Sequence, residues 1–410
     1  MLTISSRGQN MTESPIRKLS KYADQAKKDG KKVIHLNIGQ PDIKPPTEVL
    51  TEMRQLNLSE IAYSPSDGLS VLKKSIQKYY QKNHIEVREK DILVTSGASE
   101  AILFVINAVT DFGDEIITFE PFYANYIGFA VFEGVQIKTI KATIENNFAL
   151  PDLSLIEKQI SPKTKAVLLC NPNNPTGYVY SKNELEILKN IALKHHLYLI
   201  VDEVYREFFY EDENSTKGNS VLNFPELKEH AIMLDSVSKR YSMCGARIGC
   251  IVSRNEKIIQ TITKYAQARL CPPTIAQILA NKAYNISEEY LQNVVKIYKE
   301  RRDFLVDSLS KIEGVISSCP KGAFYLMVQL PVNDTDHFAQ WMLEKFDWEN
   351  KTLMVAPGSG FYNNPVDGKR EIRIAYVLNK KELKVALTIL EKALKTYPLT
   401  EQRKPKTLVK

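Results

Sequence analysis

The strongest constraint on the fold is an alternation of short apolar runs and amphipathic stretches between about Asp91 and Ser253. Apolar runs such as "DILVTSG", "DEIITFEP", "KAVLLCN", "LYLIVDEVY", "AIMLDS" and "RIGCIVS" are interspersed with helical stretches such as "SKNELEILKNIALKHH". Buried strands separated by helices predict a mainly parallel sheet with helices on both faces. In such sheets, ligands bind beyond the carboxyl ends of the strands. We therefore look for functional residues where the apolar runs end.

The C-terminal third of the chain follows a different pattern. A charged amphipathic run from Ser287 to Ile312 has the length of a helix that bridges two domains. After it come "GAFYLMVQL", "TLMVAPGSGFY", "EIRIAYV" and a final helical run, which together form an α+β pattern. We predict a large domain over residues 50–285 and a smaller domain made of residues 1–49 and 286–410.

Composition and charge exclude several classes of protein. The 410 residues carry a formal net charge of +7, and the densest basic group is the tail from Arg403 to Lys410. We interpret this tail as a solvated end rather than a nucleic-acid contact. The five cysteines form no CxxC pair, which argues against a zinc site or disulfide framework and favours a reducing compartment. Without an apolar leader or membrane-length run, we expect a cytoplasmic protein with no membrane contact.

Two segments predict a site for a phosphate group. The motif "TSGASE" places Gly97, Ala98 and Ser99 where a strand ends and a helix begins, so backbone N–H groups and the helix dipole favour an anion there. In "SVSKRYSMCGARIG", Ser236 and Arg247 can hold a phosphate through charge-assisted hydrogen bonds. Taken alone, the first motif is also typical of an ordinary strand-to-helix turn.

Three further features of the sequence indicate which molecule carries the phosphate. Lys239 follows an apolar run, so its amine is partly desolvated and suited to Schiff-base chemistry. Asp202 ends a very apolar strand, where a carboxylate needs a cation unless it only caps a helix. The loop "NPNNPTG" holds an Asn side chain rigidly between prolines, although a plain loop has the same composition. A planar phosphorylated aldehyde with a basic ring nitrogen fits this set, and that cofactor is pyridoxal phosphate.

The order of these motifs resembles a known family. SGAxE, EPFYxxY, NPNNPTG, DEVY, SxSKxxxxxGxRxG and RIA, at these separations, are similar to the class I and II aminotransferases of pyridoxal-phosphate fold type I, from about Pro15 to Tyr397. The resemblance implies a large α/β domain with a mainly parallel seven-stranded sheet, and a smaller α+β domain. It also implies a homodimer with shared active sites, in which Tyr63 of "AYSPSDG" reaches the phosphate of the neighbouring subunit's cofactor.

The resemblance implies roles for the residues around the cofactor ring. Lys239 would bind the aldehyde and then move a proton between the substrate Cα and the cofactor C4′. Asp202 would keep the ring nitrogen protonated, and Asn174 and Tyr205 would hydrogen-bond the ring 3-oxygen. Tyr123 of "EPFY" would stack on the ring, with Phe122 as the second choice. For these two aromatic residues, core packing is the alternative reading.

The resemblance also implies how substrate binds. Arg373 of "EIRIAYV" would grip the α-carboxylate, beside Asn174, and Gly39 of "LNIGQPD" would let the backbone approach it. Arg269 of "QARLCPPTIAQ" and Arg240 next to the lysine are rival candidates for a distal carboxylate. We expect a ping-pong aminotransferase that uses an L-amino acid, with aspartate first and aromatic amino acids next, and an oxo acid such as 2-oxoglutarate.

Two other functions fit the same scaffold. A β-lyase or cyclopropane-forming synthase also removes the Cα proton but continues by a different route, and no local motif excludes these enzymes. A transcriptional regulator with an aminotransferase-like domain needs a DNA-binding head. We do not expect that function, since the segment before the first strand lacks a helix-turn-helix pattern.

Overall fold

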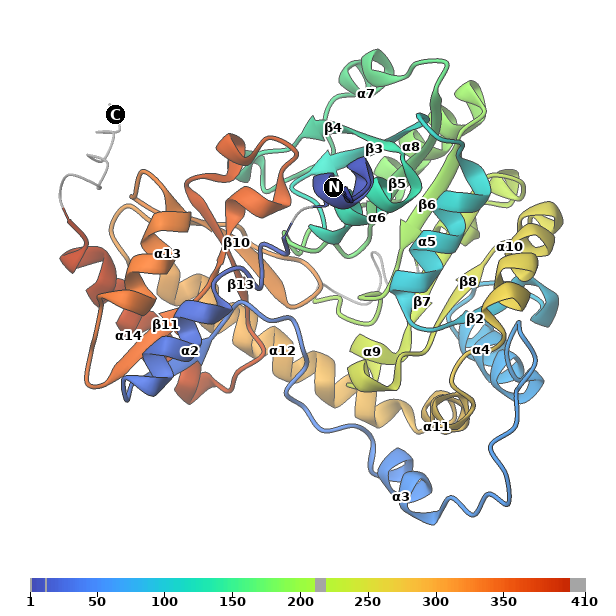
Figure 1. Cartoon of the computed structure of the whole chain (residues 1–410), viewed down its shortest axis with the longest axis horizontal. Helices are drawn as coiled ribbons and strands as arrows, with labels where there is room; N and C mark the ends of the chain where they lie inside the picture. Colours follow the sequence, from blue (N-terminus) through green and yellow to red (C-terminus); the bar gives the residue numbers. More distant parts are fainter. Residues whose placement is uncertain (1, 12, 211–218, 399–410) are drawn as a thin grey trace.

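The structure is a computed structural model of the chain, and it describes residues 2–11, 13–210 and 219–398. The basic tail from Arg403 to Lys410 lies outside the described residues. Figure 1 shows a large sheet covered by helices on one side of the molecule and the C-terminal strands and helices on the other. Helix α12 (Glu288–Leu309) passes from the C-terminal elements toward α11 (Thr274–Tyr284) (Figure 1).

The large sheet has seven strands in the order β2-β8-β7-β6-β5-β3-β4. Strand β8 runs antiparallel to its neighbours β2 and β7, whereas the remaining pairs are parallel. This arrangement confirms the predicted mainly parallel seven-stranded sheet. The strands are β2 (Ile92–Thr95), β3 (Glu115–Glu120), β4 (Gln136–Lys141), β5 (Thr164–Cys170), β6 (Tyr198–Asp202), β7 (Ala231–Ser236) and β8 (Gly249–Val252).

Alternate side chains along the strands pack against helices on opposite faces of this sheet. In β6, Leu199 and Val201 join one buried cluster and Ile200 joins the other, as a period of two requires. The first face is covered by α4 (Ser70–Lys82), α8 (Lys182–His195) and α11 (Thr274–Tyr284). The second is covered by α5 (Ala98–Val109), α6 (Asn125–Glu133) and α10 (Glu256–Arg269).

The C-terminal strands form a separate sheet in the order β12-β13-β10-β9, and all of its pairs are antiparallel. Its strands are β9 (Ile316–Ser317), β10 (Tyr325–Gln329), β12 (Ala356–Pro357) and β13 (Glu371–Ala375). Around it lie α12 (Glu288–Leu309), α13 (Thr335–Glu344) and α14 (Lys380–Thr396).

The N-terminal segment joins these C-terminal elements. Strand β1 (Lys32–His35) pairs in parallel with β11 (Lys351–Met354), and α2 (Ser20–Lys28) contacts α13. This pairing supports the proposed division of the chain, in which the N-terminal segment completes the small domain. The remaining helices are α1 (Ser6–Asn10), α3 (Thr47–Gln55), α7 (Leu153–Gln159) and α9 (Val237–Arg240).

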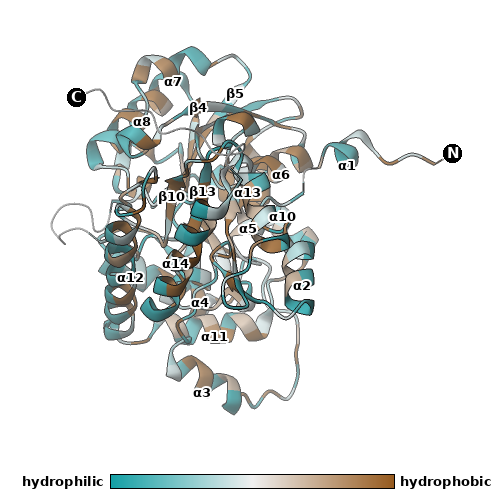
Figure 2. Ribbon diagram, turned by 90° about the vertical axis from the view of Figure 1, so that its left-hand side faces the viewer, coloured by the Kyte–Doolittle hydropathy of each residue, from teal (hydrophilic) through white to brown (hydrophobic). Residues whose placement is uncertain are grey.

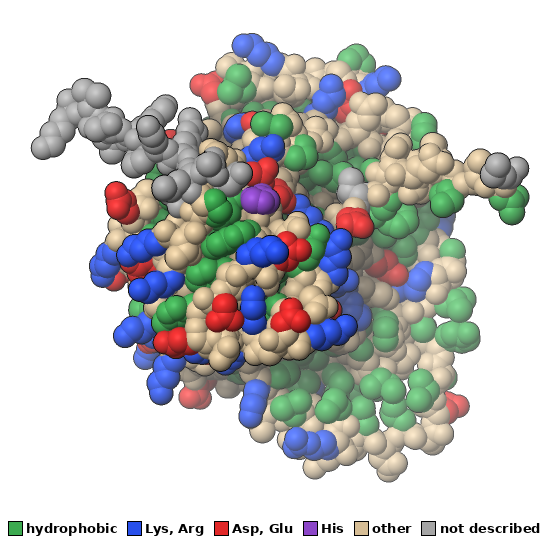
Figure 3. All heavy atoms as spheres, turned by 60° about the vertical axis from the view of Figure 1, so that its left-hand side comes forward, with side chains coloured by type: hydrophobic (Ala, Val, Ile, Leu, Met, Phe, Trp, Pro, Cys, Tyr) green, Lys and Arg blue, Asp and Glu red, His purple; other side chains and the backbone are tan. Residues whose placement is uncertain are grey.

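The outer surface of the C-terminal part is polar. Helices α12 and α14 carry hydrophilic as well as hydrophobic residues, whereas strands β10 and β13 are mainly hydrophobic (Figure 2). Figure 3 shows basic and acidic side chains interspersed over the face it presents, so the net positive charge is not gathered there. Within the described ranges, no helix combines the length and the apolar character that crossing a membrane requires.

Candidate active site

The predicted site residues gather at the carboxyl ends of the parallel strands. Gly97 follows β2 and caps α5, Asp202 is the last residue of β6, and Ser236 is the last residue of β7. The short helix α9 begins directly after β7 and carries Lys239. Because the parallel strands end at one edge of the sheet, residues far apart in the sequence lie together there.

Lys239 points toward the N-terminal segment. Its Nζ atom donates a hydrogen bond to the carbonyl oxygen of Gly39 at 2.7 Å, and the Sγ atom of Cys244 lies 3.9 Å from it. The side chain is partly exposed, so the amine can be reached from outside the fold. The amine lies near no carboxylate close enough for an ion pair among the described residues. It is therefore held in place by a neutral carbonyl group.

Asp202 is a buried carboxyl group, with 4% of its surface exposed. It accepts hydrogen bonds from the backbone N–H of Val204 at 3.3 Å and from the hydroxyl of Tyr126 at 3.2 Å. Burial raises its pKa to about 7, because desolvation penalises the charged form more than these donors stabilise it. A cation placed beside Asp202 would restore its ionised form, as the predicted ring nitrogen requires.

The predicted phosphate site combines a left-handed glycine and an arginine. Gly97 has φ +83°, and a Cβ atom there would overlap Nη2 of Arg247, so the guanidinium lies against the start of α5. Since α5 begins at Ala98, the first amides, including that of Ser99, have no acceptor within the helix. The Ser236 hydroxyl donates to the Ile248 carbonyl at 2.8 Å and accepts from Ser238 N, as the cap of α9.

The aromatic candidates differ in burial. Phe122 is 1% exposed and packs in the core on one face of the large sheet, whereas Tyr123 is partly exposed. Burial raises the pKa of Tyr123 to about 12, and the charges of Asp202 and Arg373 act on it. Tyr123 therefore feels the charges of both groups that the sequence assigns to cofactor and substrate and is partly exposed, whereas Phe122 is buried in the core.

Arg373 projects from β13 into the same region and is 1% exposed. Its Nη1 donates to the Oδ1 atom of Asn174 at 2.9 Å, and its Nη2 donates to the carbonyl oxygen of Asn37 at 2.6 Å. Its Nε has no hydrogen-bond partner within the part of the chain that the structure describes. Burial lowers the pKa of this guanidinium. A buried cation with a spare donor and only neutral partners is suited to an incoming carboxylate.

The two candidate arginines for a distal carboxylate are both already paired. Arg240 is 0% exposed, and its Nη2 lies 2.7 Å from Asp235 Oδ2. Arg269 Nη1 lies 2.9 Å from Glu100 Oε2, and its Nη2 donates to the Ser66 carbonyl at 2.9 Å. Each guanidinium thus has a carboxylate from its own chain.

Tyr63 lies apart from this cluster. It is 79% exposed, in the loop between α3 and α4, and near it in sequence Ile61 is 72% exposed. The same loop is anchored through Thr274, whose hydroxyl donates to the Ala62 carbonyl at 3.2 Å. A predicted contact with a neighbouring subunit is compatible with such an exposed aromatic residue, and within a single chain Tyr63 has no place in the site.

Three residues of the cluster are not predicted from the sequence. Tyr126 supports Asp202, Asn37 supports Arg373, and Tyr325 hydrogen-bonds Tyr205 at 2.9 Å between the two hydroxyl oxygens. Tyr126 is the last residue of the motif EPFYxxY, so the motif points to this tyrosine but does not indicate that it supports Asp202. Asn37 acts through its backbone carbonyl, which no side-chain pattern reveals.

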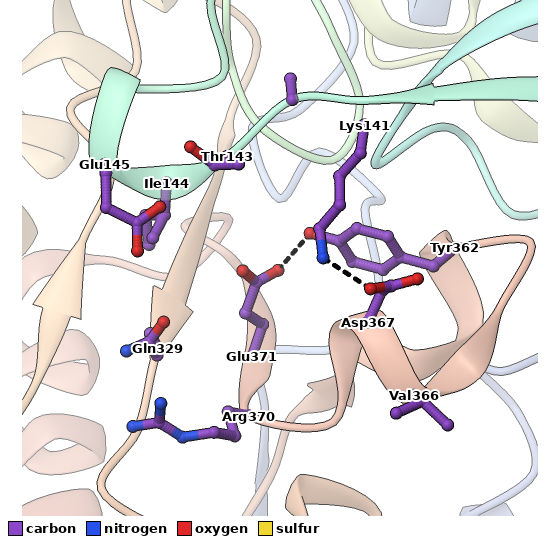
Figure 4. Close-up of a pocket in the computed structure, with 11 residues that line it drawn as sticks. Lys141, Thr143, Ile144, Glu145, Gln329, Tyr362, Val366, Asp367, Arg370 and Glu371 are labelled. Carbon is purple, nitrogen blue, oxygen red and sulfur yellow. Dashed lines mark hydrogen bonds and ion pairs between the residues drawn. The ribbon is translucent and has the colours of Figure 1, made fainter.

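A separate cavity of about 320 Å³ lies where the two parts of the chain meet (Figure 4). It is lined by residues that follow or end β4 and by residues on and near β13. In Figure 4, the Tyr362 hydroxyl donates to Glu371 at 2.6 Å, and Lys141 pairs with Asp367 at 2.6 Å. Burial raises the pKa of Glu371 to about 7. The charged groups here pair with each other rather than with the residues around Lys239.

The residues around Lys239 fit pyridoxal phosphate. The buried Asp202 carboxyl group has no cationic hydrogen-bond partner among the described residues, and the ring nitrogen would supply one. The first turn of α5 and Arg247 form an anion site around a position where only glycine fits. Lys239 supplies the amine, and Arg373 keeps a buried Nε with no hydrogen-bond partner among the described residues. These features match the cofactor's cation, phosphate and aldehyde.

Comparison with known proteins gives a consistent result. Residues 31–390 match the family model "Aminotransferase class I and II". The chain is 33% identical over 387 residues to an aspartate aminotransferase of Thermotoga maritima, with 93% of this chain and 97% of that protein covered. It is 29% identical over 394 residues to an aspartate/prephenate aminotransferase of Thermus thermophilus, covering 94% and 97%.

Solved structures show the same likeness in three dimensions. The crystal structure of the Thermotoga maritima aspartate aminotransferase matches with a TM-score of 0.86 at 32% identity, covering 96% of this chain and 100% of that one. An alanine aminotransferase of Pyrococcus furiosus matches with a TM-score of 0.85 at 30% identity and the same coverage. The predicted fold and reaction type are confirmed: the chain belongs to the class I and II aminotransferase family and is a transaminase.

Proposed function

We propose that this transaminase uses pyridoxal phosphate to move the amino group of an L-amino acid to 2-oxoglutarate, with aspartate as the first donor and aromatic amino acids next. The observation that carries the proposal is the buried Asp202 carboxyl group, which has no cationic hydrogen-bond partner among the described residues and lies at the carboxyl edge of the sheet that presents Lys239. Support for the donor comes from relatives named aspartate and aspartate/prephenate aminotransferases.

The cofactor, when bound, supplies an aldehyde that joins amines and a cationic ring that withdraws electrons from the adjoining bonds. Lys239 would hold the cofactor through its aldehyde group, and its amine would move a proton at the substrate Cα and the cofactor C4′. Asp202 would keep the ring nitrogen protonated. Gly97, Ala98, Ser99, Ser236 and Arg247 bind the phosphate in this proposal, chiefly through backbone amides and the Arg247 guanidinium.

The other residues orient the reactants. Tyr205 and Asn174 would bind the ring 3-oxygen, and Tyr123 would pack against the ring. Arg373 binds the α-carboxylate, and Asn174 holds its Nη1 in position from the other side. Gly39 lies beside the same carboxylate. Each half-reaction uses this single site, which is the physical basis of a ping-pong sequence.

We also propose a homodimer with shared sites and a cytoplasmic location. The exposed Tyr63 and Ile61 supply an apolar surface for a neighbouring subunit, and Tyr63 would reach the phosphate bound by that subunit. The five cysteines are all free, as expected in a reducing compartment.

The deciding experiment follows the absorption of the protein loaded with pyridoxal phosphate. Aspartate added without an oxo acid should convert the bound cofactor to its amino form, and 2-oxoglutarate should then restore the original band. Conversion without return would remove 2-oxoglutarate as the acceptor. A β-substituted amino acid added without an oxo acid tests the alternative, because release of pyruvate and ammonia with an unchanged band would establish a β-lyase instead.

A further inference from the structure

Tyr325 contacts three residues of the proposed site at once. It is the first residue of β10 and is 2% exposed. Its hydroxyl oxygen lies 2.9 Å from the hydroxyl oxygen of Tyr205 and 3.4 Å from the carbonyl oxygen of Gly39. Its ring centroid lies 4.4 Å from the guanidinium carbon of Arg373. Few side chains in the cluster connect residues from so many segments.

The contact with Tyr205 sets the direction of a hydrogen bond. Each phenol has one hydrogen to donate, and both hydroxyl groups are buried. If Tyr205 donates to the ring oxygen of the cofactor, as proposed above, the oxygen of Tyr205 is left to accept from Tyr325. A donor that itself accepts a hydrogen bond is polarised and donates more strongly. The Tyr325 hydroxyl therefore strengthens and orients the group that acts on the cofactor.

The contact with Gly39 links the same hydroxyl to Lys239. The Gly39 carbonyl oxygen lies 2.7 Å from Lys239 Nζ and 3.4 Å from the Tyr325 hydroxyl oxygen. Because Tyr325 has one hydrogen, donating it to Tyr205 replaces the long bond to Gly39, and Tyr325 then holds the glycine by packing alone. A Cβ atom on residue 39 would overlap the Tyr325 hydroxyl and its ring carbons. This overlap gives a physical reason for glycine at position 39, since the backbone passes directly against the tyrosine.

The ring has a second task beside the hydroxyl. The guanidinium of Arg373 lies over the rings of both Tyr325 and Phe361, with the Phe361 centroid at 4.9 Å. A cation over an aromatic face is attracted to it, and the attraction grows where water is excluded. Together with Asn174 and the Asn37 carbonyl, the two rings define where the guanidinium lies.

We propose that Tyr325 is a positioning residue of the transamination site, whose hydroxyl orients Tyr205 and whose ring packs against Gly39 and supports the Arg373 guanidinium. The inference rests on the proposed function, because it assigns Tyr325 a task through residues that hold cofactor and substrate. The proposal assigns one role to the hydroxyl of Tyr325 and another to its ring. Core packing alone requires the ring but not the hydroxyl, since phenylalanine fills almost the same volume.

Two variants and one control test the proposal on the full-length protein loaded with pyridoxal phosphate. Tyr325→Phe removes only the hydroxyl, and Tyr325→Leu also removes the ring. Tyr376→Phe is the matched control, because Tyr376 is buried in the same part of the fold and its hydroxyl donates to the Ala323 carbonyl at 3.2 Å. The readouts are the pH titration of the bound cofactor's absorption band, KM for 2-oxoglutarate, and the thermal unfolding temperature.

The expected results differ between the two variants. Tyr325→Phe should move the pH midpoint of the absorption change upward by roughly half a unit, since a weaker Tyr205 donor leaves more charge on the ring oxygen. Its KM should stay within about twofold of the wild type, because the ring still lies under Arg373. Tyr325→Leu should raise KM about tenfold, and Tyr376→Phe should change neither quantity.

Three outcomes would overturn the inference: an unchanged midpoint in Tyr325→Phe, an equal shift in Tyr376→Phe, or an unchanged KM in Tyr325→Leu. Should Tyr325→Leu fail to fold, the midpoint of Tyr325→Phe decides alone. Failure of the proposed function looks different, because the wild type would then transfer no amino group. A wild type that transfers it normally, beside a Tyr325→Phe with an unshifted midpoint, removes only the role of Tyr325.

Discussion

The Nζ atom of Lys239 lies 2.7 Å from the carbonyl oxygen of Gly39, although the two residues are 200 positions apart in the chain. Gly39 follows β1, which pairs with β11 of the C-terminal part, whereas Lys239 follows β7 of the large sheet. The amine therefore lies where the two parts of the fold meet. Under the proposed function, a substrate held by Lys239 and Arg373 would be contacted by both parts of the fold.

Replacement of Lys239 tests the core of the mechanism. Lys239→Ala should lower amino transfer by more than about 10³-fold, since it removes the group that moves the proton. The side chain is partly exposed and pairs only with neutral groups, so we expect an unchanged fold by circular dichroism. Lys257→Ala is the control, because Lys257 is exposed on α10. Appreciable transfer by the Lys239 variant would refute its assignment.

Asp202→Asn should leave the site intact and remove the negative charge. The amide keeps the size of the carboxyl group and still accepts from Tyr126, but it no longer favours a protonated ring nitrogen. We expect kcat to fall about 10²- to 10³-fold, the range seen when one preorganised electrostatic group is lost. Single-turnover kinetics with aspartate measure this directly. A rate within a few-fold of the wild type would show that Asp202 does not act on the ring.

Arg373→Lys keeps the positive charge but loses the planar fork that binds a carboxylate in two places. We expect KM for amino acids and oxo acids to rise about 10- to 100-fold, which corresponds to one lost charge-assisted hydrogen bond. Steady-state kinetics with several substrates check this, and Arg370→Lys is a control, since Arg370 lines the separate cavity of Figure 4. An equal effect of both variants would point to a general disturbance of this strand.

Much of the site could be predicted because its residues follow buried strands, and the apolar runs around Asp202 and Lys239 are visible in the sequence. The residues that contact these side chains could not be predicted, because they come from segments far away in the sequence. From the sequence, Arg240 is a candidate cation next to Lys239. In the structure it forms an ion pair with Asp235, and its guanidinium lies over tyrosine rings from helices α4 and α11. Ser236 reads as a phosphate ligand, yet its hydroxyl also caps α9.

The buried Glu371 predicts how stability depends on pH. Its pKa is raised to about 7 by burial, against an ordinary value of 4.5, so the folded protein binds this proton more tightly than the unfolded chain. Stability from this group is fully present below about pH 4.5 and is lost as the pH rises to about 7. Glu371→Gln stays neutral, so its unfolding temperature should fall less than that of the wild type between pH 5 and 7. Parallel curves for the two proteins would contradict the prediction.

The last prediction concerns whether Arg269 binds the distal carboxylate of a substrate such as aspartate. Its guanidinium is held by Glu100 at 2.9 Å and by the Ser66 carbonyl, so a substrate carboxylate would have to displace a partner that is already in place. We therefore expect Arg269→Met to change kcat/KM for aspartate and for phenylalanine by the same factor, within about twofold. A selective loss of aspartate by about 10- to 100-fold would instead show that Arg269 leaves Glu100 to bind substrate.

Glu100→Gln is the matched variant for this last test, since it removes the carboxylate that holds Arg269 and keeps the size of the side chain. If Arg269 does not read substrate, the ratio of kcat/KM for aspartate to that for phenylalanine stays constant in this variant as well. If it does, the freed guanidinium should raise that ratio, because Glu100 no longer competes with the distal carboxylate for the same donors. Opposite changes in the two variants would thus assign the distal carboxylate to Arg269, and a constant ratio in both would exclude it.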